Sequence, residues 1–251
     1  AAFDYLVKVY MTTRNYREAI SSIEKIKVKS PSVKEAYQRV TYYRGLEYFN
    51  DGNYSKALEM LNLSLEHGSY NRTYRVLSLY WSAEANFQLG NFSQAIKGYN
   101  EFQTSAGAFS LPEFGTAYYN TAYAYFKLKN YNEAASWFRK YVNQSKVTDE
   151  QKADAYNRLA DSYYIKREFE EAAKFYTLSI NMGTYDTDYA LFQRASCYGM
   201  DRGFQQKIDD LQAIVSKYPR SAFIDDALYE MGRTYERLND NDKAIASYNT
   251  L

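Results

Sequence analysis

The sequence has little of what catalysis, metal binding or covalent cross-linking requires. A single cysteine, Cys197, excludes an internal disulfide framework and a cysteine-rich metal site, and a single histidine, His67, excludes a multi-histidine metal site. No GxxxxGK[ST] or GxGxxG phosphate-binding loop occurs, and the carboxylates are scattered singly. We therefore expect no catalytic, cofactor-binding or metal site, and we expect that the protein is not an enzyme.

The chain also lacks an excess of charge and a long apolar run. Its 31 lysines and arginines nearly balance 30 aspartates and glutamates, so no nucleic-acid partner is expected. No apolar run approaches the roughly 18 residues that a transmembrane helix needs, so direct membrane insertion is not expected. The chain begins AAFDY without Met and stops at SYNTL within a helical pattern, so we expect a piece of a longer protein.

One ten-residue phrase recurs seven times along the chain. It reads RNYREAISSI from residue 14, GNYSKALEML from 52, GNFSQAIKGY from 90, KNYNEAASWF from 129, REFEEAAKFY from 167, RGFQQKIDDL from 202 and NDNDKAIASY from 239. We call the sixth residue of each phrase the anchor: Ala19, Ala57, Ala95, Ala134, Ala172, Lys207 and Ala244, spaced 35 to 39 residues apart. A fixed period in this range is typical of a solenoid built from repeats.

Each repeat is predicted to be two antiparallel helices. Aromatic residues lie three residues before most anchors and large apolar residues four after, and spacings by threes and fours are helical. The turn falls at GN, KN or RN, and the three prolines, Pro31, Pro112 and Pro219, fall between repeats. A small anchor lets the two helices approach closely. Lys207 is the exception, and its side chain is expected to point out of the helix contact.

The repeat pattern resembles the tetratricopeptide repeat family. The segments LYEMGRTYERLNDNDKAIASY and AYNRLADSYYIKREFEEAAKFY follow its motif at nearly every position. The resemblance implies an all-α, right-handed solenoid of about seven antiparallel helix pairs. It would form one domain over residues 1–251, with repeats at about 1–33, 38–71, 76–109, 115–148, 153–186, 188–221 and 225–251. The segment SKYPRSAFIDDALYEMGRTYERL is similar to repeats of bacterial cell-envelope lipoproteins, which favours the periplasm or cell envelope over the cytoplasm.

The resemblance also implies a binding face. In this family the first helix of each repeat lines a concave groove, and the tyrosines nine residues before the anchors (Tyr10, Tyr48, Tyr125, Tyr163 and Tyr235) are expected in the core. The predicted groove residues are Tyr42, Phe49, Tyr80, Phe87, Tyr119, Asn120, Tyr123, Phe126, Arg158 and Tyr164. Exposed aromatics suit recognition, so we expect a non-catalytic scaffold that binds a peptide segment or helix of a protein partner.

Several alternatives stay open at this point. The protein's own segment could fill the groove, and the chain could be a sensor or assembly region of a multidomain protein. Carbohydrate could stack on the tyrosines and Trp81, because aromatic faces suit sugar rings. Self-association through an open C-terminal helix is a further expectation, whereas the partner itself is not named by these residues.

Overall fold

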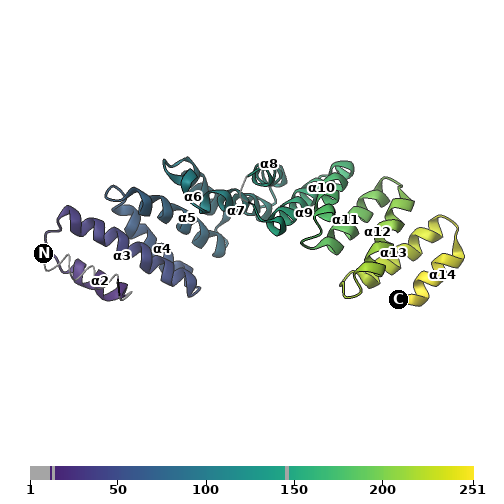
Figure 1. The fold of residues 1–251 in the computed structure, drawn as a ribbon, viewed down its shortest axis with the longest axis horizontal. Coiled ribbons are helices and arrows are strands. Elements are labelled where there is room, and N and C mark those ends of the chain that lie inside the picture. The colour runs from purple at the N-terminus through teal and green to yellow at the C-terminus, as the bar shows by residue number, and fades with distance from the viewer. Residues whose placement is uncertain (1–11, 13–14, 145–146) are drawn as a thin grey trace. The chain divides into compact units, whose positions relative to one another are not determined.

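The structure is a computed structural model that describes residue 12, residues 15–144 and residues 147–251, and this part of the chain is helical without a strand (Figure 1). The first helices of the repeats are α3 (Pro31–Asn50), α5 (Arg72–Gln88), α7 (Glu113–Lys127), α9 (Asp149–Ile165), α11 (Thr187–Met200) and α13 (Ile224–Arg237). The second helices are α2 (Tyr16–Glu24), α4 (Tyr54–Glu66), α6 (Phe92–Thr104), α8 (Tyr131–Val142), α10 (Phe169–Met182), α12 (Phe204–Lys217) and α14 (Asn241–Thr250). A short 3₁₀ helix, η1 (Ala108–Ser110), lies between α6 and α7. The predicted all-α class is confirmed, and Tyr10 lies outside the described residues.

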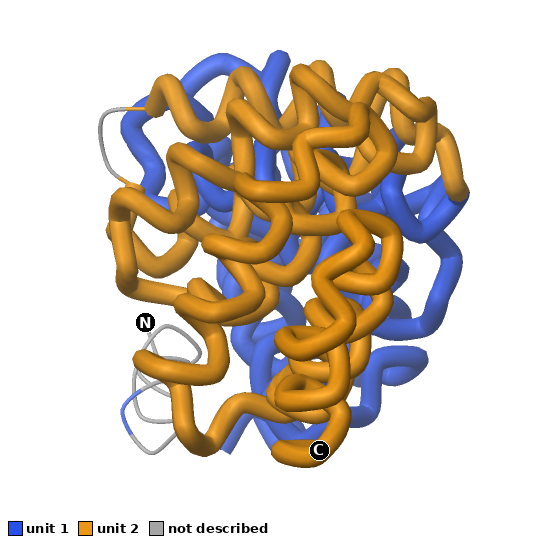
Figure 2. Tube along the Cα trace, turned by 90° about the vertical axis from the view of Figure 1, so that its right-hand side faces the viewer, with its two compact units in different colours: residues 1–128 blue, residues 129–251 orange. Residues whose placement is uncertain are grey.

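The chain divides into two compact units, residues 1–128 and residues 129–251 (Figure 2). In the first unit α2 to α7 pack in chain order, and α5 also contacts the first helices on either side of it, α3 and α7. In the second unit α8 to α14 pack in chain order. Each unit is thus a stack of helical hairpins, as expected for an α-solenoid. The expectation of one domain over residues 1–251 stays a prediction.

Several helices begin where a side chain accepts a hydrogen bond from an otherwise unpaired backbone N–H group. The Ser30 hydroxyl oxygen accepts from the backbone N–H of Val33 at 3.3 Å, directly before Pro31 at the first position of α3. The Thr148 hydroxyl oxygen accepts from the backbone N–H of Gln151 at 3.2 Å at the start of α9. These caps explain why the first helices start in the joints between repeats.

The turn within a repeat has the same backbone conformation in six repeats. The residue five before the anchor has a positive φ in each of them: Gly52 (74°), Gly90 (77°), Lys129 (59°), Arg167 (62°), Arg202 (59°) and Asn239 (59°). The next backbone N–H donates back to a carbonyl of the first helix, as from Asn53 to Tyr48 at 2.8 Å and from Asp240 to Tyr235 at 2.9 Å. This is the Schellman arrangement, which ends one helix sharply enough for the next to run back along it.

Within the compact units, the anchors of the helix pairs α3–α4, α5–α6, α9–α10 and α13–α14 lie at the contact between the two helices. The six alanine anchors are at most 3 % exposed. In these four pairs a small residue stands twelve residues before the anchor: Gly45, Ala83, Ala160 and Gly232. At the glycines there is no room for more, because a Cβ on Gly45 would lie 2.7 Å from the Leu61 side chain, and one on Gly232 would lie 2.4 Å from the Tyr248 ring. The predicted role of small residues in setting the helix spacing is therefore confirmed.

Lys207 does not behave as the sequence suggested. Its side chain is only 12 % exposed, and its Nζ lies 2.5 Å from Oε2 of Glu230 on α13, the first helix of the next repeat. Gly199 on α11 makes room, because a Cβ there would lie 3.1 Å from Cδ of Lys207. The prediction that Lys207 leaves the contact is wrong, because the missing side chain at Gly199 accommodates the aliphatic stem and Glu230 pairs with the ammonium.

The tyrosines nine residues before the anchors are less buried than expected. Tyr163 is buried, whereas Tyr48, Tyr125 and Tyr235 are half-buried. Tyr48 and Tyr235 nevertheless pack against hydrophobic core clusters, so the prediction that they belong to the core is confirmed although their rings are partly exposed. Cations account for two of the half-buried rings, since the Arg44 guanidinium lies 4.1 Å from the Tyr48 ring centroid and the Lys243 ammonium 5.4 Å from that of Tyr235.

Candidate interaction surface

All ten residues predicted to line the groove lie on first helices. In the first unit α3, α5 and α7 carry eight of them, and in the second unit α9 carries Arg158 and Tyr164. Eight of the ten are half-buried: Phe49, Phe87, Tyr119, Asn120, Tyr123, Phe126, Arg158 and Tyr164. In each unit, we call the side of the first helices that carries its share of these residues the first-helix face of that unit.

Tyr42 and Tyr80 were predicted to stand outside the packing of the repeat, and this is wrong. Each is only 5 % exposed. The Tyr42 ring centroid lies 5.3 Å from that of Tyr74, and the Tyr80 centroid lies 5.2 Å from that of Phe102. A tyrosine at this register is long enough to reach a neighbouring helix, so its ring joins the core instead of facing a partner.

Three other aromatic residues of the face brace the turn of their own repeat. The ring centroids of Phe49 and Tyr54 lie 5.2 Å apart, and those of Phe87 and Phe92 lie 5.3 Å apart. In the second unit Tyr164 and Phe169 repeat the contact at 5.4 Å. Each pair joins the end of a first helix to the start of the second, five residues on. These face residues therefore have a place in the repeat's packing, which the sequence analysis did not give them.

Tyr119 and Tyr123 on α7 form a compact aromatic pair on the face. They lie one helical turn apart, their ring centroids are 4.8 Å apart and both side chains are half-buried. Tyrosine has few rotatable bonds, so such a pair presents a large contact area whose ordering in a complex loses little entropy. This pair and Asn120 beside it lie together on α7, within the predicted groove.

A buried carboxylate fixes Asn120. The Asn120 amide of α7 and the Tyr99 hydroxyl of α6 both donate to Oε1 of Glu84 on α5, the hydroxyl at 2.8 Å. Glu84 is 8 % exposed and forms none of the ion pairs found between described residues. Burial raises the pKa of the Glu84 carboxyl above its usual range, against the lowering effect of these hydrogen bonds. The cluster holds three helices of the first unit together at the face.

The second unit has a related cluster around Asp161. Its carboxylate accepts from the Tyr176 hydroxyl at 2.6 Å, from the Tyr189 hydroxyl at 2.7 Å and from Nη1 of Arg158 at 2.5 Å. Nε of Arg158 also donates to Asp154 at 3.4 Å. Arg158, a predicted groove residue, is thus held by two carboxylates of its own helix. Its guanidinium neutralises Asp161, whereas the hydrogen-bond donors to Glu84 in the first unit are uncharged.

The two clusters share a spacing that the sequence analysis missed. Glu84 and Tyr99 are fifteen residues apart, and so are Asp161 and Tyr176. Each acid follows the small residue of the first helix, and each tyrosine stands four residues after the anchor, where the phrase alone suggests an apolar position. An acid at this place with a tyrosine fifteen residues later is the signal that could have identified the pairs.

The described residues can be compared with the requirements of a metal site, a reactive thiol and a membrane-spanning helix. They contain no cluster of three or more histidine, cysteine or acidic side chains able to hold a metal ion. Cys197 is 1 % exposed, as expected of a packed thiol, and burial raises its pKa to about 12. Among the described helices none is both long and apolar enough to cross a bilayer.

Models of the tetratricopeptide repeat match residues 82–146, residues 153–182, and residues 189–221 with 226–251, together more than half of the chain. The chain belongs to the tetratricopeptide repeat family. The matched segments begin within α5 and extend with gaps to residue 251, so they include five of the seven anchors. Comparison with curated proteins finds no match.

Solved structures, two of them described as tetratricopeptide repeat proteins, share the fold at low sequence identity. The C-terminal part of a repeat protein from Cytophaga hutchinsonii matches with a TM-score of 0.66 and 18 % identity, covering 98 % of this chain and 93 % of that one. RapI, in its apo form, matches with a TM-score of 0.68 and 12 % identity over 98 % of this chain and 73 % of that one. YrrB, described as a repeat protein with an unusual peptide-binding site, matches with a TM-score of 0.59 and 17 % identity over 76 % of this chain and 90 % of that one.

Proposed function

We propose that this tetratricopeptide repeat protein is a non-catalytic scaffold that binds a peptide segment or helix of a protein partner on its first-helix face. The observation that carries the proposal is the pair Tyr119 and Tyr123, packed at 4.8 Å and half-buried on α7. Repeats of this family support protein interaction, and YrrB provides a precedent for a peptide site on the same fold. A place in the bacterial cell envelope and self-association through α14 remain predictions.

The mechanism is preorganisation. Asn120 is held by Glu84, and Glu84 is held in turn by Tyr99, so the polar group beside the tyrosines is already oriented before a partner arrives. The aromatic pair adds apolar area, and the Asn120 side chain can contact the peptide backbone. A fixed arrangement loses little side-chain entropy on binding, which is the advantage of a stiff scaffold over a flexible one.

A displayed random-peptide library selected on the full chain tests the proposal. We expect Tyr119→Ala with Tyr123→Ala to weaken the selected peptides at least about tenfold, because a few central aromatics dominate such interfaces. The control is Phe109→Ala, which removes an aromatic ring that is 83 % exposed on η1 and is not among the predicted groove residues. It should leave binding unchanged.

Thermal unfolding followed by circular dichroism separates recognition from stability. The double variant should unfold within a few degrees of the parent, whereas Tyr99→Ala, at a position that is 0 % exposed, should lose several kcal/mol of stability. Unchanged affinity of the double variant for every selected peptide contradicts the proposal. Selective binding in a glycan screen, without any peptide, would support the carbohydrate alternative instead.

A further inference from the structure

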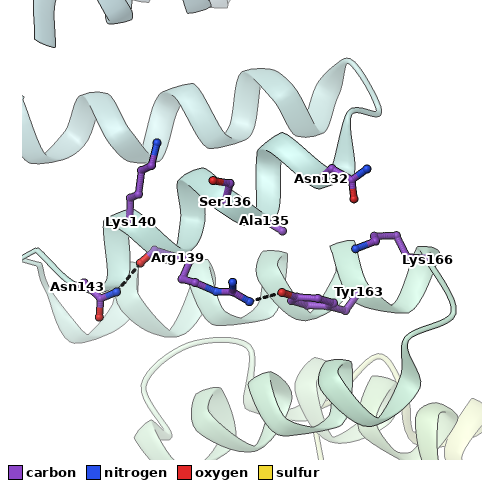
Figure 3. Close-up of a pocket in the computed structure, with 8 residues that line it drawn as sticks. All are labelled: Asn132, Ala135, Ser136, Arg139, Lys140, Asn143, Tyr163 and Lys166. Carbon is purple, nitrogen blue, oxygen red and sulfur yellow. Dashed lines mark hydrogen bonds between the residues drawn. The ribbon is translucent and has the colours of Figure 1, made fainter. Parts of the chain in front are cut away.

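The second unit contains a basic cavity that the proposed function does not use. It has a volume of about 350 Å³ and lies between α8 and the end of α9, where Ser136, Arg139, Lys140, Asn143, Tyr163 and Lys166 line it (Figure 3). Tyr163 projects from α9 about 140–160° away from Arg158 and Asp161, because successive helical residues are rotated by about 100°. Lys166 follows directly after Ile165, the last residue of α9. The cavity is therefore distinct from the first-helix face.

The charges that line the cavity are all positive. Three cations contribute, Arg139, Lys140 and Lys166, and no aspartate or glutamate does. Arg139 and Lys140 form none of the ion pairs found between described residues, whereas Lys166 pairs with Glu168 at 2.8 Å. A concave, partly enclosed site of one sign concentrates counter-ions, because its low-dielectric walls focus the field.

The cations are held in place by aromatic rings rather than by acids. Arg139 donates to the Tyr163 hydroxyl, and its guanidinium carbon lies 5.8 Å from the centroid of that ring. Lys166 lies 5.1 Å from the centroid of the same ring. Figure 3 shows Arg139 and Lys166 reaching toward the Tyr163 ring from opposite ends, between α8 and α9. The Lys140 side chain leaves α8 in a different direction from that of Arg139. Its Nζ lies 4.0 Å from the centroid of the Trp137 ring. Cation–π contacts leave the charge of each cation available to an anion.

We propose that this cavity binds an oxyanion of the phosphate class, either free phosphate or the phosphate group of a phosphorylated side chain. A phosphate monoester carries a charge of about −1.5 to −2 at neutral pH and three strong acceptor oxygens, which matches more than one cation. The planar Arg139 guanidinium supplies several N–H donors, and the Ser136 hydroxyl and Lys166 ammonium supply others. A single carboxylate would leave part of this charge uncompensated.

The competing explanation is structural. Arg139 and Lys140 lie in the last turn of α8, where cations stabilise a helix end whether or not a ligand binds. Under that explanation, replacing them lowers stability, and phosphate has no saturable effect on the parent protein. The two explanations therefore differ in a ligand-dependent measurement.

Tryptophan fluorescence of the full chain provides that measurement. The chain has two tryptophans, and Trp81→Phe leaves Trp137, beneath Lys140, as the reporter. Inorganic phosphate, O-phosphoserine, a phosphoserine peptide and glutamate are titrated at constant ionic strength, with chloride as the balancing ion. We expect saturable fluorescence changes with the phosphate compounds, and a higher unfolding temperature in their presence. Tighter binding of inorganic phosphate would identify a free ion as the ligand, and tighter binding of the phosphopeptide a modified partner.

Matched variants complete the test. Arg139→Gln and Lys140→Gln should each weaken phosphate binding, Arg139→Gln by at least about tenfold, as expected for the loss of a charge-assisted hydrogen bond. Lys174→Gln removes the same charge from α10, where Lys174 is exposed and pairs with Glu170 and Glu171, and should change affinity less than about twofold. A linear response to phosphate, an equal response to glutamate, or equal losses in all three variants would overturn the proposal.

Discussion

Lys207 shows at the scale of one residue how a repeat tolerates a departure from its own pattern. The lysine replaces the small anchor, and Gly199 on the facing helix gives up the space that the lysine stem takes. The ammonium then pairs with Glu230 at 2.5 Å on the next first helix. Burial alone would raise the pKa of the Glu230 carboxyl. The hydrogen bond and the charge of Lys207 outweigh this effect and hold the pKa of Glu230 below its usual range.

Restoring the common residue at this anchor should therefore destabilise the protein. We expect Lys207→Ala to lower the free energy of unfolding by about 1–2 kcal/mol near pH 7, because it opens a space beside Gly199 and leaves Glu230 with only Arg233, at 3.4 Å, as an ionic partner. Urea denaturation measures the difference. If the alanine variant is more stable than the parent, the compensation by Gly199 and Glu230 is refuted.

The pH dependence of that difference follows from the direction of the pKa shift. A carboxylate whose folded pKa is depressed contributes stability that is fully present above its unfolded pKa, about 4.3, and is lost as the pH falls through the lower folded pKa. The stability gap between parent and Lys207→Ala should thus be constant from about pH 6 to 8 and shrink below about pH 4. Lys174→Gln, which breaks only exposed ion pairs, is the control with little gap at any pH.

Asn157 has a buried side-chain amide that is expected to lower the stability of the fold. Its side chain on α9 is 0 % exposed, and neither its amide nitrogen nor its amide oxygen has a hydrogen-bond partner among the described residues. An unsatisfied buried polar group lowers stability by about 1–3 kcal/mol. Asn157→Ala should therefore raise the free energy of unfolding by about 1 kcal/mol, helped by the helix propensity of alanine.

The matched control is Leu159→Ala on the same helix, also 0 % exposed. It should lower stability by about 2–5 kcal/mol in the same urea denaturation, as large-to-small core changes do. A loss of stability in Asn157→Ala as well would show that the buried amide is satisfied by an ordered water in solution.

The predicted groove residues show which features of the face follow from the sequence and which do not. The register correctly placed all ten predicted residues on first helices, because helical periodicity is local. It did not reveal that Tyr42 and Tyr80 reach into the core or that Glu84 and Asp161 gather hydroxyl groups. Those contacts join residues fifteen or more positions apart, and they depend on side-chain length and on the offset between hairpins, neither of which the repeat phrase encodes.

At the scale of the element, the repeat pattern predicts the turns within repeats better than it predicts where the first helices begin. The tight turn after each first helix was predicted from GN, KN and RN, since a Schellman ending leaves few backbone choices. The helix starts were less well defined. α3 begins at Pro31, earlier than the repeat boundary at residue 38, because Ser30 and Pro31 extend it into the joint between repeats.

The turns also predict a stabilising change. Arg167 has a φ of 62° and an exposed side chain, so it adopts a left-handed conformation that glycine adopts at lower energy. Arg167→Gly should raise the free energy of unfolding by about 0.5–1 kcal/mol, after allowance for the greater freedom of glycine in the unfolded chain. Gly90→Ala, at a φ of 77° with open space around it, is the reverse control and should lower stability by about 1 kcal/mol. Chemical denaturation that shows equal stability for both variants would contradict the argument.

At the scale of the whole molecule, contacts between helices stay local in the chain. Among the described helices, substantial contacts join consecutive helices or the first helices of adjacent repeats. Stability is then close to a sum of repeat and neighbour contributions, and a defect opens the chain near itself before it unfolds the rest. The ion pair between Lys207 and Glu230 is one such neighbour contribution, and it joins α12 to α13.

Hydrogen exchange should reveal this locality in the Lys207→Ala variant. We expect amides of α11, α12 and α13 to exchange faster, about tenfold for each 1.4 kcal/mol lost, because these helices meet at Lys207, Gly199 and Glu230. Amides of α3 to α6, which belong to the other compact unit, should keep their parental rates. Equal acceleration along the chain would mean that the protein opens as one cooperative body, and the nearest-neighbour description would then fail for this solenoid.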